Sequence, residues 1–298
     1  LRRVGDLARV NMGSGVLGAV LGVAALWLWG RDGLLAMILI GPLTSFVLGH
    51  VYVARLGPPK GPRADLPALA GQWSQMVRLG IPFMLSGLVT LLGHLAARTL
   101  VQRDLGVEAL GQFQAAWTIG MIYLGFVLGA MGTDYYPRLT AAIEDRSTAV
   151  RLVNEQTEVA LLLCAPVLLA MLGLAPWVIR LLYSDAFGPA VEILRWQLLG
   201  DMLKVMSWPL GFVLLARGAG KTFIFTESTG IAAFVLGIAL LMPQVGVMAT
   251  GAAFLAMYAV YLPLVSLMAR RAIGFRWSRA VKAQDLAVML AAVTVELA

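Results

Sequence analysis

Apolar residues in this chain come in long blocks separated by short charged stretches, and each block is long enough to cross a lipid bilayer. A helix rises about 1.5 Å per residue, so about 20 apolar residues span the roughly 30 Å hydrocarbon core of a membrane. The composition agrees, because 60% of the 298 residues are hydrophobic and 13% are charged, against about 25% charged residues in soluble domains. The sequence therefore predicts an all-α, polytopic membrane protein.

The positions of the charges divide the chain into eight complete spans and one incomplete span. The eight predicted spans are 10–30, 33–54, 79–97, 109–133, 159–179, 196–216, 222–242 and 247–269. A further apolar run begins at Leu286 and is too short to cross a bilayer before the last residue. We therefore expect a bundle of about 8–9 transmembrane helices.

Basic residues are divided unevenly between the two sides of these spans. If the spans alternate, 17 of the 23 Lys and Arg residues share the side of residue 1, 5 lie on the opposite side, and Lys204 lies inside a span. Cytoplasmic loops carry the excess of Lys and Arg, so residue 1 and the segments 55–78, 134–158 and 270–285 are predicted to be cytoplasmic. The chain starts without Met and stops inside an apolar run, and we expect it to be a piece of a longer protein.

Several function classes are disfavoured by residues that the chain lacks. One cysteine, Cys164, and two histidines give no disulfide framework and no ordinary zinc site. The GAGKT stretch, 218–222, has Leu215 where a phosphate-binding loop needs its first glycine. The basic residues are scattered between apolar blocks, so we expect no nucleic-acid partner. No catalytic pattern stands out, and we expect a protein that is not an enzyme and holds no metal or tightly bound cofactor.

Ionisable groups inside apolar spans are the most informative residues, because a charge in hydrocarbon costs several kcal/mol unless it faces a partner or water. In the sixth span Gln197, Asp201, Lys204 and Trp208 fall on one helical stripe, with Lys204 near the middle. Two interpretations stay open. The stripe lines a wet, ligand-facing interior, or Asp201 and Lys204 form a self-compensating pair that only faces the bundle.

Other polar residues are weaker candidates. Glu227 is the only acid between Thr222 and Ala269, and it suits either a functional site or an interfacial position. His94, Arg98 and Gln102 share a face at the end of the third span, where Arg98 either presents charge to an anion or anchors the helix at the interface.

Glycines recur four residues apart in two spans. The pairs are Gly18 with Gly22 and Gly125 with Gly129. Small residues at this spacing let helix backbones approach closely in lipid, so we interpret both pairs as helix-packing sites.

A stretch around the fourth span resembles a known family. Residues 109–140, ALGQFQAAWTIGMIYLGFVLGAMGTDYYPRLT, are similar to the corresponding helix of bacterial polysaccharide flippases, which belong to the multidrug/oligosaccharidyl-lipid/polysaccharide exporter superfamily. The most specific part is the exit motif formed by Thr133, Asp134, Tyr135, Tyr136, Pro137 and Arg138. The remaining spans resemble the family through hydropathy and loop lengths.

The resemblance implies a two-lobed fold around a central cavity. Residues 1–54 would be the last two helices of the first lobe, and 55–78 would be a cytoplasmic connection with a short interfacial helix. Residues 79–269 would be the six-helix second lobe, and 270–298 a basic cytoplasmic segment followed by the start of a further helix. About four helices that the family has at the front would then be missing from this sequence.

The resemblance also implies a function in the bacterial inner membrane. The family moves undecaprenyl-diphosphate-linked oligosaccharides from the cytoplasmic to the periplasmic leaflet, which demands a cationic, wet cavity. Expected partners are the bilayer, the lipid-linked oligosaccharide, a polysaccharide polymerase and a chain-length regulator, and a proton or sodium ion is the expected coupling ion. The candidate cations are Lys204, Arg98 and Arg103, and the candidate sugar or ion ligands are Asp201, Glu227, Gln197 and Gln114. The alternatives are a cation-coupled small-molecule antiporter of the same superfamily and a membrane-embedded polysaccharide polymerase or ligase.

Overall fold

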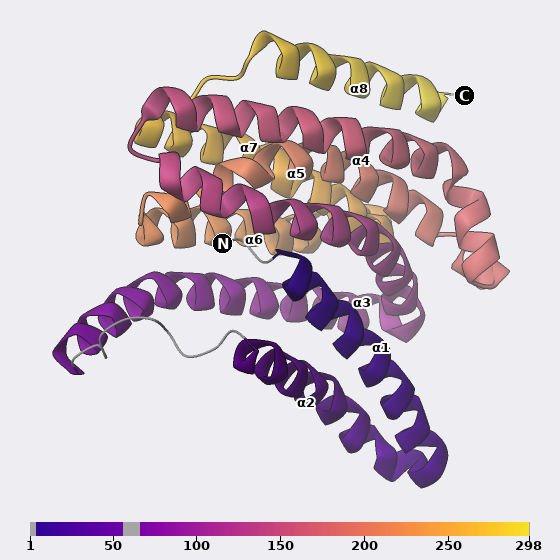
Figure 1. The fold of residues 1–298 in the computed structure, drawn as a ribbon. Coiled ribbons are helices and arrows are strands. Elements are labelled where there is room, and N and C mark those ends of the chain that lie inside the picture. Colours follow the sequence, from indigo (N-terminus) through magenta and orange to yellow (C-terminus); the bar gives the residue numbers. More distant parts are fainter. Residues whose placement is uncertain (1–3, 56–65, 298) are drawn as a thin grey trace. The chain divides into compact units, whose positions relative to one another are not determined.

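The computed structural model describes residues 4–55 and 66–297 as helices joined by short turns (Figure 1). The all-α fold class is confirmed, since no strand occurs among the described residues. The helices are α1 (Val4–Trp29), α2 (Gly33–Ala54), α3 (Leu66–Ala142), α4 (Arg146–Leu182), α5 (Ala190–Ala216), α6 (Gly220–Val245), α7 (Ala249–Ile273) and α8 (Arg279–Leu297). The chain divides into two compact units, residues 1–69 and 70–298, which we describe separately.

The long helix α3 contains a break that makes it two antiparallel helices. Gly106 has φ 89° and ψ 178°, a conformation open to glycine, and Figure 1 shows α3 turning back on itself. Five continuous helical stretches are long and apolar enough to cross a membrane. Three of these stretches turn back, at 30–32, at Gly106 and at 246–248, so eight helices of the described residues lie at the eight predicted spans. Helix α8 is a ninth helix.

The two helices that meet in segment 134–158, α3 and α4, are longer than the apolar blocks predict. Segment 134–158 is helical except for a tight turn at 143–145, because α3 ends at Ala142 and α4 begins at Arg146. Asp145 caps α4 and accepts hydrogen bonds from the N–H groups of Ser147 and Thr148. The hydroxyls of Thr148 and Ser147 also donate to this exposed carboxylate, which lowers the pKa of Asp145 to about 2.

The connection predicted at 55–78 is only partly described. Residues 56–65 lie outside the described part of the chain. From Leu66 onward the backbone is one helix that continues through the predicted third span. The short helix expected before residue 79 is present from Leu66, but it is the first part of α3 and not a separate element. Its position at the membrane interface stays a prediction.

Residues 1–69 contain the α1–α2 hairpin. A Cβ on Gly18 would lie 3.3 Å from the Cα of Gly41, and one on Gly22 would lie 3.1 Å from Met37 Cγ, so these glycines allow close approach as predicted. The same interpretation is wrong for Gly125 and Gly129 within this chain, because a Cβ on either would meet no heavy atom of the described residues within 4 Å.

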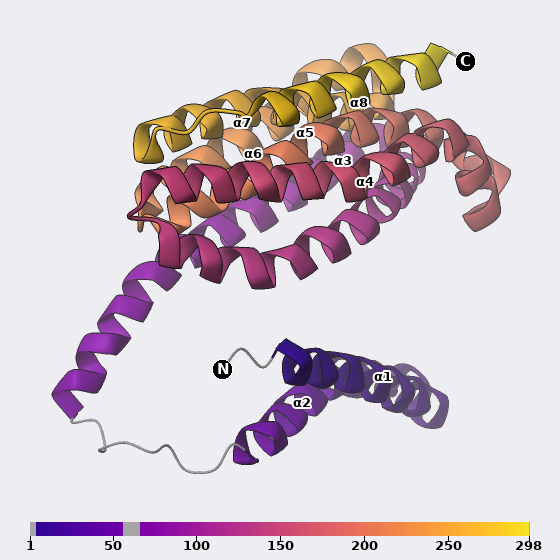
Figure 2. The same ribbon diagram turned by 45° about the horizontal axis from the view of Figure 1, so that its top comes forward.

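The second unit is built around α5, which packs against α4 and α7 (Figure 2). A Cβ on Gly251 of α7 would lie 2.6 Å from the carbonyl oxygen of Ile193 of α5, so the two backbones nearly touch. Helix α8 begins at Arg279, before the predicted start at Leu286, and packs on α4. Asn154 fixes the α7–α8 connection by accepting from the Ser278 N–H at 2.7 Å.

A membrane cavity with a central lysine

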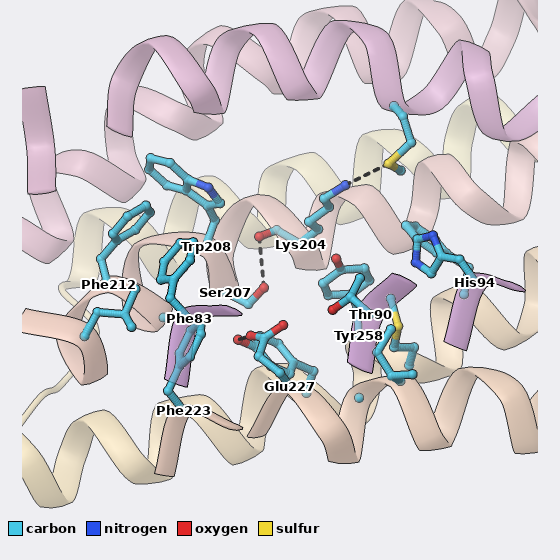
Figure 3. A pocket seen from close by; sticks show the side chains of 18 of the residues that line it. Phe83, Thr90, His94, Lys204, Ser207, Trp208, Phe212, Phe223, Glu227 and Tyr258 are labelled. Atoms are coloured by element: carbon cyan, nitrogen blue, oxygen red, sulfur yellow. Dashed lines mark hydrogen bonds between the residues drawn. The ribbon is translucent and has the colours of Figure 1, made fainter. Parts of the chain in front are cut away.

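The second unit encloses a cavity of about 340 Å³ between α3, α5, α6 and α7 (Figure 3). Both halves of α3 contribute to its wall, so the reversal at Gly106 is needed to form it. The lining is mostly apolar and aromatic, with a small number of polar side chains. Such a composition is typical of a ligand-binding cavity.

Lys204 points into this cavity from the middle of α5. Its Nζ lies 3.7 Å from Asp201 Oδ1, 3.2 Å from the Met121 sulfur and 5.8 Å from the centre of the Phe254 ring. The side chain is 19% exposed. The structure thus combines the two interpretations that the sequence left open, since Lys204 is paired with Asp201 and also faces a cavity.

Asp201 and Gln197 lie behind Lys204 and are completely buried. Both carboxylate oxygens of Asp201 and both amide atoms of Gln197 have no hydrogen-bond partner among the described residues. Gly120 of α3 lies next to them, and a Cβ there would be in ordinary van der Waals contact, 3.4 Å from Asp201 Oδ2 and 3.8 Å from Gln197 Oε1. Four unsatisfied buried atoms in one place are unusual, because native proteins satisfy most such groups.

Glu227 and His94 also line the cavity wall, together with the phenols of Tyr258 and Tyr261. Glu227 of α6 accepts a hydrogen bond from the hydroxyl of Tyr261 of α7. His94 of α3 packs edge-on against Trp117, with ring centroids 4.6 Å apart. The sequence grouped His94 with Arg98 but did not rank it among the candidate ligands. Its position one turn before Arg98 on an otherwise apolar helix was the available signal.

The other predicted polar residues do not line this cavity. Arg103 forms an exposed ion pair with its neighbour Asp104, with Nε 2.6 Å from Oδ1. Gln114 donates to Thr118 on its own helix at 3.2 Å. Arg98 is half-buried one turn beyond His94. The structure therefore brings Lys204, Asp201, Gln197 and Glu227 together and leaves Arg98, Arg103 and Gln114 apart from them.

Tyr135 is the buried member of the predicted exit motif. It is 2% exposed, and its hydroxyl donates to the carbonyl of Pro209 at 3.1 Å. Its ring packs against Trp208 and Phe212 of α5, with centroids 6.1 Å and 5.9 Å away. Tyr135 therefore supports the part of the cavity wall that these two aromatic residues form.

The rest of the motif lies at the surface of the second unit. Asp134 and Arg138 form an exposed ion pair one turn apart, at 3.2 Å. Tyr136 is half-buried and contacts Phe212, while Thr133 and Pro137 are exposed. The motif lies within α3 rather than after it, because the helix continues to Ala142.

The fold and the cavity define a multi-pass, all-α membrane protein. Solved structures with this fold include a MATE mutant, with a TM-score of 0.71, 18% identity and coverage of 91% of this chain and 63% of that chain. They also include the lipid II flippase MurJ in an inward closed conformation, with a TM-score of 0.64, 11% identity and coverage of 95% and 65%.

The chain belongs to the family described as polysaccharide biosynthesis protein, which matches residues 4–192, more than half of the chain. It is 26% identical over 257 residues to the lipid III flippase of Escherichia coli (strain K12), and it resembles the lipid III flippase of Shigella flexneri equally. The resemblance to flippases of the exporter superfamily is thereby confirmed. The aligned region covers 84% of this chain and 61% of these relatives, so the chain spans about three-fifths of their length.

Proposed function

We propose that this chain is part of a flippase that moves an undecaprenyl-diphosphate-linked oligosaccharide from the cytoplasmic to the periplasmic leaflet of the bacterial inner membrane. One observation carries the proposal, namely a lysine at mid-span that faces a cavity instead of lipid. A diphosphate crossing a bilayer needs a positive charge along its path, because an unpaired anion in hydrocarbon is costly. The lipid III flippases supply the substrate class by similarity.

In this function Lys204 binds the diphosphate while the prenyl chain stays in the lipid. The ammonium is held by one carboxylate at 3.7 Å and by a thioether, which is a weak acceptor. An ammonium has three donors, so it keeps capacity for phosphate oxygens. No bond is made or broken, so the protein supplies electrostatics and a path rather than catalysis.

Asp201 and Gln197 are proposed to carry the coupling ion. Among the described residues three buried oxygens there have no hydrogen-bond partner, two from Asp201 and one from Gln197. Hard cations in proteins take about six or more oxygen ligands, and the Lys204 ammonium already lies next to this carboxylate. A proton therefore fits the donor set better than a sodium ion. Protonation of Asp201 would release Lys204 to the diphosphate.

The domain plan and orientation follow as proposals. Residues 1–54 are the last two helices of the first lobe, 79–269 are the second lobe, and 270–298 continue into a further helix. The excess of basic residues on the side of residue 1 supports the proposal that this side is cytoplasmic. A polysaccharide polymerase and a chain-length regulator are the proposed partners.

The second candidate is a cation-coupled small-molecule antiporter, which is favoured by the likeness to MATE structures and by the aromatic cavity lining. An anion requires the positive charge at position 204, whereas a cationic drug does not. A membrane polymerase or ligase has less support, because the relatives are flippases and the described connections between helices are short.

Charge substitutions at position 204 test the proposal in the whole protein. Lys204→Glu should abolish surface polysaccharide at a normal membrane level, and Lys204→Arg should retain part of it. The Asp201→Lys, Lys204→Asp double variant keeps the pair with its order swapped and controls for folding. Arg103→Glu is the matched control, because this arginine is exposed and lies outside the cavity wall. Full export by the Lys204→Glu variant would contradict the proposal.

A further inference from the structure

The cavity has two chemically different ends (Figure 3). One end holds His94, with Lys204 between it and the opposite end. The opposite end is formed by Trp208, Phe212, Phe83 and Phe223, which come from three different helices. Aromatic rings also line the cavity beside His94 and Lys204, where Trp117 and Phe254 lie. The opposite end is distinguished by four rings from three helices that gather in one place.

Two aromatic rings of α5 form one wall of this end. Trp208 and Phe212 are one turn apart, with ring centroids 4.8 Å apart and planes at 70°. Each is half-buried and lines the cavity, while the buried Tyr135 packs behind both. The rings are therefore held in fixed positions with part of their surface open to a ligand.

The wall formed by α3 and α6 is also aromatic. Phe83 and Phe223 are nearly parallel, with centroids 6.0 Å apart and planes at 14°. Phe223 lies near the start of α6, and the first residue of α6, Gly220, packs against Pro82, the neighbour of Phe83 in α3. Aromatic surface is thus present on more than one side of the same space.

Polar groups lie between the aromatic end and Lys204. Glu227 accepts from Tyr261, and Ser207 donates its hydroxyl to the carbonyl of Lys204 at 2.9 Å. A carboxylate has about four acceptor positions and a hydroxyl has two lone pairs, so both side chains keep acceptor capacity toward the cavity. Aromatic faces beside acceptors match a pyranose ring, which has apolar C–H faces and a rim of hydroxyl donors.

The size of the cavity limits what it can hold. Its volume of about 340 Å³ lies near the lower limit of ligand pockets, which measure about 300–1,000 Å³. This space suits a diphosphate and one sugar, and because the cavity is partly open the other sugars of a repeat can extend out of it.

We propose that the aromatic end is a monosaccharide subsite that binds the sugar attached directly to the diphosphate, with Trp208 as its stacking surface and Glu227 as its hydroxyl acceptor. The inference rests on the proposed function and adds to it. Lys204 recognises the diphosphate that all such lipids share, whereas the subsite recognises the first sugar. The remaining sugars lie outside this cavity.

Binding to two lipids tests the subsite in the whole protein reconstituted in nanodiscs. The probes are undecaprenyl diphosphate and undecaprenyl diphosphate carrying one N-acetylglucosamine, and the dissociation constant of each is measured. The wild type should bind the sugar-bearing lipid more tightly. Trp208→Leu should reduce this preference about two- to tenfold, the range of one aromatic contact, and should therefore weaken binding of the sugar-bearing lipid more than binding of the bare lipid. Lys204→Gln should weaken binding of both lipids.

Three further variants separate recognition from folding. Trp208→Phe keeps an aromatic face and should retain most of the preference, while Glu227→Gln keeps the shape and should reduce it. Trp177→Leu is the matched control, because Trp177 is 68% exposed on α4 and lies outside the cavity lining. If Trp208→Leu lowers the yield of folded protein, the preference of the Glu227→Gln variant decides the question.

The outcomes distinguish the two proposals. Equal binding of both lipids by the wild type, with loss in the Lys204→Gln variant, would refute the subsite and leave the proposed function standing. Equal weakening of both lipids by Trp208→Leu would show a purely structural role and also refute the subsite. Binding of neither lipid by the wild type would refute the proposed function and the subsite together. Tighter binding of a hydrophobic cation, tetraphenylphosphonium, than of either lipid would favour the antiporter instead.

Discussion

The Asp201–Lys204 pair should show strong energetic coupling, and its size can be worked out from the structure. Two unit charges about 4 Å apart attract by about 4 kcal/mol at an effective dielectric constant of about 20, and these groups are 3.7 Å apart. The partners differ in burial, because the Asp201 side chain is 0% exposed and that of Lys204 is 19% exposed. Removing the lysine therefore leaves the more deeply buried charge alone.

The two single substitutions should consequently have unequal effects. Lys204→Gln leaves a buried carboxylate without its partner, a change that costs about 3–5 kcal/mol of unfolding free energy in buried pairs. Asp201→Asn leaves an ammonium at the cavity edge, where water reaches it, and should cost less. The Asp201→Asn, Lys204→Gln double variant has two neutral amides and should be more stable than the Lys204→Gln variant. From the double-mutant cycle of the wild type, the two single variants and this double variant, we expect a coupling energy of about 2–4 kcal/mol.

Thermal unfolding of the purified whole protein in detergent is the assay. At about 2 °C per kcal/mol for a chain of this size, Lys204→Gln should lower the Tm by about 6 °C or more. The double variant should recover at least half of that loss. The exposed Asp134–Arg138 pair is the matched control, for which we expect coupling below about 0.5 kcal/mol. Additive losses at 201 and 204, within about 0.5 kcal/mol, would refute the coupling.

Three further predictions concern topology, packing and the exit motif. In a cysteine-free background, cysteine at Arg103 should react with an impermeant thiol reagent added to intact spheroplasts and cysteine at Arg146 should not, and the reverse pattern would invert the proposed orientation. Gly251→Ala should destabilise the protein by about 1–3 kcal/mol in thermal unfolding, because the added methyl group overlaps the backbone of α5. Gly125→Ala is the control and should be neutral, and equal Tm values for the two variants would contradict the α5–α7 contact. Tyr135→Phe should cost about 0.5–1.5 kcal/mol through one lost hydrogen bond, and an unchanged Tm would contradict that bond's contribution.

The sequence predicts features that depend on composition along one helix. Hydropathy locates the spans because each must be apolar by itself, and Lys204 stands out because a mid-span charge is rare whatever its surroundings. The sequence predicts separate spans on either side of Gly106. It does not show that the connection between them is a break at this one glycine, because backbone angles cannot be read from a residue's identity. The lengths of α3 and α4 were underestimated because polar residues such as Asp134 mark where lipid ends, not where the helix ends.

Features that depend on contacts between helices were not predictable from one sequence. Phe83, Trp208 and Phe223 lie far apart in the chain and meet only because α3, α5 and α6 pack together. Arg103 and Gln114 had polar chemistry similar to that of the cavity residues, but their neighbours Asp104 and Thr118 satisfy them locally. A helical stripe identifies the residues that share a face, and the partner helices decide whether that face meets a cavity.

The arrangement around Asp201 is difficult to explain by stability alone. Replacing a buried ion pair with apolar residues of similar volume is often neutral or stabilising, and here Gln197 adds further unsatisfied buried atoms. A lysine that must stay charged in a membrane needs a nearby anion when the substrate is absent. When the substrate binds, the lysine must exchange that anion for the substrate. Asp201 meets the first need through its distance of 3.7 Å. The second need is met if a proton replaces the lysine, as we propose, because among the described residues Lys204 is the only polar partner of that carboxylate.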